Sequence, residues 1–248
     1  MLERCQRVWK EDHFATLTAL SNLAQLLSQQ GRYGEALPLS LRALEVKRRV
    51  HGLEHEETIA SANNHASLLY HMGRHRDAEA LSRSTLVIAW RVLGNEHRYT
   101  LISINGLASS LQDLGRLDEC EPLMRECLET RRRVYGSDHP DTLIAINNFA
   151  GLLHARCRFD EAEPLYRERL ATCRRTQLPT HPQVLLAANN LGMLLKDMRR
   201  WDEGEALLVE ALAGYTATLG EGHPRTRATA SSLEELRRGR GSGGGRGR

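Results

Sequence analysis

Apolar residues recur along this chain with a period of 42 residues, and a histidine marks the start of each repeat. Counting from that histidine as offset 0, leucine stands at offset 14 in all five complete repeats, and mostly small residues stand at offsets 11 and 23. Repetition on this scale is typical of stacked supersecondary units, each of which buries its apolar face against its neighbours. The marker residues are His13, His55, His97, His139, His181 and His223.

Each repeat predicts two helices. Apolar residues at offsets 3, 7, 10, 11, 14 and 17 follow the spacing of one helical face, and a second such stripe runs from offset 23 to offset 37. A turn separates them, marked by Gly31-Arg32 in the first repeat and by equivalent pairs in the next two. Small residues at offsets 11 and 23 predict a close approach of the paired helices. We therefore expect an all-α protein.

The repeat register divides the whole chain. Residues 13–222 make five complete repeats, and residues 223–236 are expected to form only the first helix of a sixth. Leu2, Val8 and Trp9 match late offsets of a second helix, so residues 1–12 are interpreted as the end of a truncated preceding repeat. Residues 237–248 consist of arginine, glycine and one serine, a composition that predicts a disordered tail.

Charge and cysteine content narrow the possible settings. The formal net charge is +3, but the tail holds five arginines, so residues 1–236 sum to −2 and the body is not basic. No run of residues approaches the roughly 20 apolar positions that a membrane span needs. Five cysteines without a Cys-x-x-Cys pair favour reduced thiols. We therefore expect a cytoplasmic protein that does not enter a membrane.

Particular motifs identify the class of helical repeat. Residues 139–142 read His-Pro-Asp-Thr, residues 147–150 read Asn-Asn-Phe-Ala, and residues 161–165 read Glu-Ala-Glu-Pro-Leu. This repeat resembles the 42-residue tetratricopeptide repeat of kinesin light chains and of nephrocystin-like arrays, and the resemblance covers nearly all of residues 1–236. It implies a right-handed α-solenoid. It also implies that the protein is a non-enzymatic scaffold whose first helices line a concave groove, with a cargo-adaptor role like that of a kinesin light chain.

Catalytic, metal and cofactor chemistry finds little support in the sequence. No phosphate-binding loop, nucleophile elbow or zinc-protease motif is present. The period histidines are too far apart to share a metal ion, so we interpret them as helix-start residues. Trp201-Asp202 resembles a propeller signature, but it aligns with the start of a second helix in other repeats. We expect no enzyme activity, no metal and no cofactor.

A column of asparagines carries the binding hypothesis. Asparagine is a mediocre helix former, so its repeated use at offsets 8 and 9 of the first helix needs a cause. One interpretation is structural, an amide bonding a neighbouring helix. The other is a ladder of amides that grips an extended peptide, because an amide both donates and accepts hydrogen bonds. In kinesin light chains, which these repeats resemble, groove asparagines hold cargo peptides. The proposed peptide-binding residues are Asn63, Asn105, Asn147 and Asn189, Asn64, Asn148 and Asn190, with Tyr70, Gln112, His154 and Lys196 beside them.

Two other functions stay open at this point. Arginine- and glycine-rich segments can contact RNA through phosphate charge and base stacking, so the tail is an alternative binding element. The start of the chain inside a predicted second helix also suggests that the chain is the repeat portion of a larger multidomain signalling enzyme. We take a protein or peptide ligand as the first hypothesis.

Overall fold

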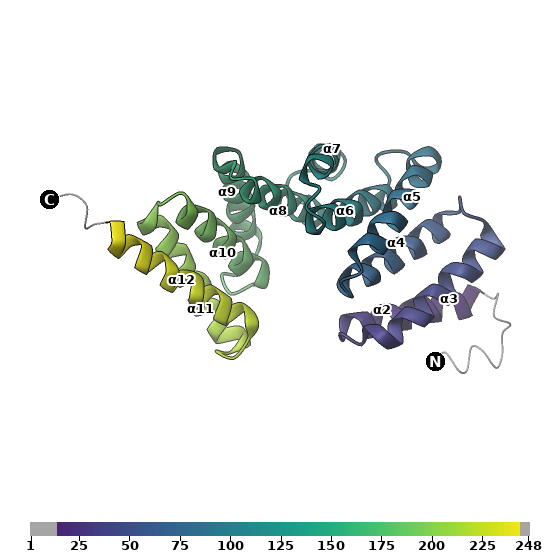
Figure 1. Ribbon diagram of the computed structural model, residues 1–248, viewed down its shortest axis with the longest axis horizontal. Coiled ribbons are helices and arrows are strands. Elements are labelled where there is room, and N and C mark those ends of the chain that lie inside the picture. Colours follow the sequence, from purple (N-terminus) through teal and green to yellow (C-terminus); the bar gives the residue numbers. More distant parts are fainter. Residues whose placement is uncertain (1–13, 244–248) are drawn as a thin grey trace. The chain divides into compact units, whose positions relative to one another are not determined.

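The computed structural model describes residues 14–243, and within that range every regular element is an α-helix (Figure 1). The chain divides into two compact units, with the boundary between Gly136 and Ser137. Unit 1 contains six helices in the described range: α2 (Phe14–Gln29), α3 (Tyr33–His51), α4 (Glu56–His71), α5 (His75–Leu93), α6 (Arg98–Asp113) and α7 (Leu117–Tyr135). Unit 2 contains five: α8 (Pro140–Ala155), α9 (Phe159–Thr176), α10 (Pro182–Asp197), α11 (Trp201–Leu219) and α12 (Pro224–Gly243). The predicted all-α fold is confirmed.

The period histidines act as helix N-caps. In each case the histidine Nδ1 atom accepts a hydrogen bond from the backbone N–H two residues later. This bond is present at His55, His97, His139, His181 and His223. This bond satisfies one of the donors that a helix N-terminus leaves unpaired. The first helices from α4 onward therefore all begin one residue after a histidine, which explains the regular period. His13 lies outside the described residues.

The leucine and small-residue offsets form the core of each hairpin. Leu69 and Leu111 in unit 1, and Leu153 and Leu195 in unit 2, are buried at offset 14. Offset 23 is buried as well, where Ala36, Ala78 and Ala162 line up with Cys120. At offset 11 of the fifth repeat, a Cβ atom placed on Gly192 would lie 2.9 Å from Cγ of Leu208. Close helix approach therefore selects small residues, as the sequence pattern predicts.

The hairpin turns differ between the units. Gly31, Gly73 and Gly115 adopt a left-handed conformation with φ of +75°, which glycine tolerates at no steric cost. In unit 2 the equivalent residues are Cys157, with φ of +58°, and Arg199, with φ of +60°. These two residues are strained because their Cβ atoms crowd the following carbonyl. The unit 2 turns therefore store strain that the unit 1 turns lack.

The last helix is longer than the sequence predicts. We expected the first helix of the sixth repeat to end at residue 236 and a disordered tail to begin at 237, but α12 continues to Gly243. Arg237 pairs with Glu205 at 2.7 Å, and Arg240 pairs with Asp202 at 2.8 Å, both on α11. Arg237 occupies offset 14, where the five complete repeats have leucine. Ion pairs with α11 therefore extend the helix past the predicted boundary. Residues 1–12, predicted as a partial repeat, lie outside the described residues, as do residues 244–248.

Candidate functional site

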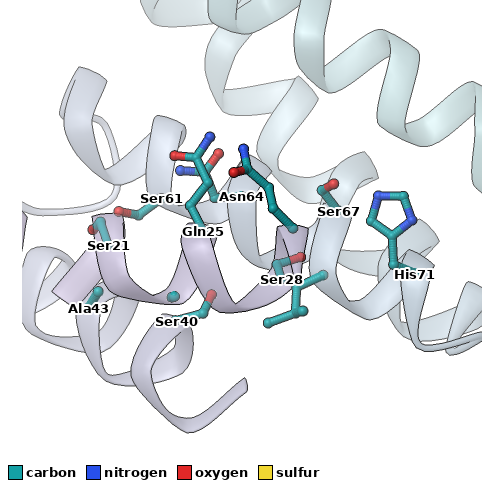
Figure 2. A pocket seen from close by; sticks show the side chains of 12 residues that line it. Ser21, Gln25, Ser28, Ser40, Ala43, Ser61, Asn64, Ser67 and His71 are labelled. Atoms are coloured by element: carbon teal, nitrogen blue, oxygen red, sulfur yellow. The ribbon is translucent and has the colours of Figure 1, made fainter. Parts of the chain in front are cut away.

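A cleft of about 200 Å³ opens between the first two hairpins of unit 1 (Figure 2). Helices α2 and α4 form its two sides, and Ser40 and Ala43 of α3 close it from below in Figure 2. We call this feature the α2–α4 cleft. Its lining residues are Ser21, Ala24, Gln25, Ser28 and Gln29 of α2, Ser40 and Ala43 of α3, and Ser61, Asn64, Ser67, Leu68 and His71 of α4.

The lining is rich in hydrogen-bonding groups but contains no aspartate, glutamate, lysine or arginine. Gln25, Gln29 and Asn64 are exposed, and no side-chain hydrogen bond joins them to another residue within 14–243. Ser21 adds a buried hydroxyl oxygen that has no hydrogen-bond partner among the described residues. An amide or hydroxyl can both donate and accept, so this lining suits a ligand that is polar and uncharged, such as a peptide backbone.

A buried histidine contacts one of the residues that line the cleft. His65 of α4 is buried, and its Nδ1 atom lies 2.9 Å from Oγ of Ser40, which lines the cleft. Burial lowers the pKa of His65, and the positive charges of Arg48 and Arg74 lower the pKa further. A neutral imidazole at physiological pH therefore fixes the position of the Ser40 hydroxyl.

Aromatic rings occupy the His71 end of the cleft. The His71 ring stacks on Tyr33, with 6.2 Å between centroids, and meets the edge of the Tyr70 ring at 5.5 Å. Burial and a hydrogen bond with Asp113 raise the pKa of Tyr70 to about 12. Tyr70, which we predicted as a ligand contact, is therefore engaged with α6 and with the His75 ring.

Asn63, the first of the predicted asparagines in unit 1, is a structural amide. Its side chain is 6% exposed, its Nδ2 donates to the carbonyl oxygen of Tyr99 at 3.0 Å, and its Oδ1 accepts from Ser103 at 2.7 Å. Both partners lie on α6, the first helix of the next hairpin. These bonds agree with the structural interpretation of the asparagine column, because the Asn63 amide joins two neighbouring first helices.

Three predicted asparagines of unit 2 also bond neighbouring helices. Asn190 of α10 donates to Oδ1 of Asn147 on α8 at 2.8 Å. Asn189 accepts from the hydroxyl of Thr229 on α12 at 2.9 Å. Three other proposed amides are half-buried: Asn105 and Gln112 of α6, and Asn148 of α8. The asparagine column is therefore largely structural in unit 2.

Two further predicted residues of unit 2, His154 and Lys196, also have partners within the unit. His154 Nε2 lies 2.8 Å from Oδ2 of Asp197, and the His154 ring contacts Phe159 and Tyr166 edge-on. Lys196 Nζ lies 2.9 Å from Oε2 of Glu235 on α12. These side chains link the first helices α8, α10 and α12. Of the eleven predicted residues, Asn64 alone lines the α2–α4 cleft.

Sequence reasoning missed most of the cleft residues. Gln25 and Ser67 share offset 12, and Gln29 and His71 share offset 16. The hydrogen-bonding side chains at these two offsets of the first two repeats were therefore a usable signal. Asparagine at offsets 8 and 9 was the more regular pattern, and that regularity reflects helix-to-helix bonding. Among the described residues, no group of three or more histidine, cysteine or acidic side chains is placed to bind a metal ion. None of the described helices has the length and apolar character to cross a bilayer.

The chain belongs to the tetratricopeptide repeat family. One profile of this family matches residues 1–49, 15–89 and 99–175, and a second tetratricopeptide repeat profile matches residues 184–225. The resemblance predicted from the His-Pro-Asp-Thr and Glu-Ala-Glu-Pro-Leu motifs is therefore confirmed. No curated protein matches the sequence significantly.

Solved structures with the same fold include several repeat proteins. BtubC (BKLC) from P. vanneervenii has a TM-score of 0.74 and 22% identity, over 90% of this chain and 89% of that one. A putative kinesin light chain of Podospora anserina with nearly identical repeats has a TM-score of 0.72 and 22% identity, over 85% and 98%. A Rap protein in complex with Competence and Sporulation Factor has a TM-score of 0.67 and 14% identity, over 88% and 64%. At these identities the similarity concerns the fold.

Proposed function

We propose that this protein is a non-enzymatic interaction scaffold that binds an extended, uncharged peptide segment of another protein in the α2–α4 cleft. One observation carries the proposal. The cleft presents amides and hydroxyls that are not used for packing within the described chain, including the buried and unpartnered Ser21 oxygen. Elsewhere on the first helices, equivalent amides already bond their neighbours.

An extended peptide fits the chemistry of this lining. Its backbone offers one donor and one acceptor per residue, and Gln25, Gln29 and Asn64 can pair with both kinds of group. The absence of aspartate, glutamate, lysine and arginine from the cleft lining disfavours a charged segment, because its charges would lose water without gaining a partner of opposite charge. The Rap fold neighbour, in complex with Competence and Sporulation Factor, supports a binding role for this architecture. Binding of a cargo protein, as in kinesin light chains, is one form of the proposal.

The RNA alternative receives less support from the structure. Arg237 and Arg240, two of the five tail arginines, already pair with carboxylates of α11. These pairs reduce the positive charge that the tail can offer to phosphates. We therefore place binding in unit 1 and not at the arginines of α12.

A peptide selection tests the proposal. Binders are selected from a random-peptide display library against the full chain, and the affinity of the best peptide is measured by calorimetry. Removing two cleft amides in Gln25→Ala/Asn64→Ala should weaken binding by roughly 10-fold or more, since each hydrogen bond contributes about 0.5–1.5 kcal/mol.

Asn22→Ala is the matched control, because Asn22 is an exposed amide on α2 that does not line the cleft. It should leave the affinity unchanged. Full affinity in the double variant, with its helical content intact, would place the peptide elsewhere on the molecule.

A further inference from the structure

Unit 2 contains a buried cation that no part of the peptide-binding proposal uses. Arg169 lies on α9, and its side chain is 2% exposed. Its Nη2 donates to Oε1 of Gln183 on α10 at 2.8 Å, while Nε and Nη1 have no hydrogen-bond partner. Taking a charged group out of water is unfavourable unless a countercharge or a full set of hydrogen bonds replaces the lost hydration. Arg169 has neither within the described residues.

The titratable groups around Arg169 do not supply a negative charge at physiological pH. Those that affect it most are the Cys173 thiol and the phenols of Tyr166 and Tyr215. Burial raises the pKa of Cys173, raises the pKa of Tyr166 to about 12 and also raises the pKa of Tyr215. All three groups therefore stay neutral. Burial lowers the pKa of Arg169, but a guanidinium stays protonated at neutral pH because its ordinary pKa is so high.

One junction of unit 1, between α3 and α4, holds an ion pair near the corresponding position. There the buried Lys47 of α3 forms an ion pair with Glu57, with 3.3 Å between Nζ and Oε2. Glu57 and Gln183 hold equivalent positions, each two residues after the N-cap histidine of its first helix. Arg169 lies one helical turn earlier on its helix than Lys47 does on α3. The junction of α3 with α4 therefore has a carboxylate at this position, where the junction of α9 with α10 has a neutral amide.

We propose that Arg169 is a binding site for a carboxylate supplied by another molecule, with Gln183 as a displaceable cover. Gln183 is exposed in the first turn of α10, so its side chain can rotate outward without disturbing the core. A planar carboxylate matches the fork of guanidinium N–H donors and can accept two hydrogen bonds in parallel. The positive end of the α10 helix dipole also favours a negative charge at this place.

The direct test uses formate as the probe on the full chain, at constant ionic strength maintained with chloride. The measurements are the Arg169 Nε–H signal in a ¹H–¹⁵N NMR spectrum and the thermal midpoint of unfolding. Formate should shift the Nε–H signal saturably and raise the midpoint. A signal that does not move, or one that moves without saturation, would overturn the proposal.

Two variants separate this site from general salt effects. Gln183→Glu supplies the carboxylate from within the chain, as Glu57 does in unit 1, so it should raise the midpoint by itself and abolish the saturable response to formate. An undiminished response in Gln183→Glu would contradict the proposal. Arg169→Met removes the charge while keeping apolar volume, and its midpoint should not respond to formate. If Arg169→Met does not fold, the comparison of wild type with Gln183→Glu still decides the result.

The source of the carboxylate is distinguished with capped tripeptides, Gly-Glu-Gly against Gly-Gln-Gly. One outcome is that the glutamate tripeptide shifts the Nε–H signal saturably at a concentration no higher than the one at which formate does so. That result assigns the site to an acidic side chain of a protein partner. A response to formate without a response to the glutamate tripeptide assigns it to a free small carboxylate. A response to both tripeptides alike would overturn the proposal, because it would not depend on the carboxylate.

Discussion

The first helices of the two units use similar polar residues for different purposes. In unit 2, Asn147 bonds Asn190 and Asn189 bonds Thr229, so these amides tie neighbouring helices together. In unit 1, Gln25, Gln29 and Asn64 line a cleft and make no side-chain hydrogen bond to another residue within 14–243. An amide that already has its partners gains little from a ligand, whereas an open amide exchanges its bonds to water for bonds to the ligand, at a net gain of about 0.5–1.5 kcal/mol per bond. Under the proposed function, a repeated polar residue marks a binding surface only where its neighbours leave it unpaired.

Shortening a buried leucine should lower the free energy of unfolding by a similar amount in either unit. This is the largest effect that we expect. Leu111 of unit 1 and Leu195 of unit 2 share offset 14 and are 0% exposed. Leu→Ala at either position should destabilise the protein by about 2–5 kcal/mol, from lost burial and the cavity left behind. Urea unfolding measures the change. A cost below about 0.5 kcal/mol at either site would show that the units do not share one type of core.

Adjacent asparagines of α4 should differ sharply. Asn63→Ala removes the two hydrogen bonds of a buried amide, to Tyr99 and Ser103, and at about 0.5–1.5 kcal/mol for each bond it should cost about 1–3 kcal/mol of stability. Asn64→Ala removes an exposed cleft amide and should stay within about 0.5 kcal/mol. Chemical denaturation of the two variants side by side checks this. Equal costs would remove the distinction between structural and ligand-facing amides.

The strained turns of unit 2 should be improvable, unlike those of unit 1. Cys157→Gly and Arg199→Gly relieve left-handed backbone strain of about 1–2 kcal/mol, offset in part by the greater entropy of glycine in the unfolded chain. We expect a net gain of up to about 1 kcal/mol at each site. Gly115→Ala in unit 1 is the reverse control and should destabilise the protein. Thermal unfolding measures the three midpoints. A Gly115→Ala midpoint as high as that of Cys157→Gly or Arg199→Gly would contradict the account.

The smallest effect is a pH dependence confined to unit 1. The pKa of His65 is lowered in the folded protein, so the unfolded chain binds its proton more readily. The stability that the neutral imidazole contributes is therefore complete above its ordinary pKa of about 6.5 and is lost as the pH falls through the lowered folded-state value. Glu45 acts in the opposite direction but more weakly than Arg48 and Arg74. Urea unfolding at about pH 7.5 and about pH 5.5 should show a smaller pH dependence for His65→Gln than for wild type.

The sequence predicted the features that depend on local spacing. The histidines of the 42-residue period are helix N-caps, and the leucines at offset 14 are buried. Both features follow from the geometry of a single hairpin, so the sequence alone predicts them. The sequence left a structural and a ligand-binding role open for Asn63, because the choice depends on which atoms of Tyr99 and Ser103 the next hairpin brings into reach. The cleft was missed for a similar reason, since Ser21, Ser40 and Ser67 come from three helices. The end of α12 was misplaced because its ion pairs with α11 are tertiary contacts.

The central claim is that a ligand binds the open amides of unit 1 and leaves the paired amides of unit 2 undisturbed. Side-chain amide signals in a ¹H–¹⁵N NMR titration with the selected peptide test it most directly. The account predicts saturable shifts for Gln25, Gln29 and Asn64, with Asn147, Asn189 and Asn190 unmoved. Saturable shifts confined to the unit 2 asparagines would contradict it.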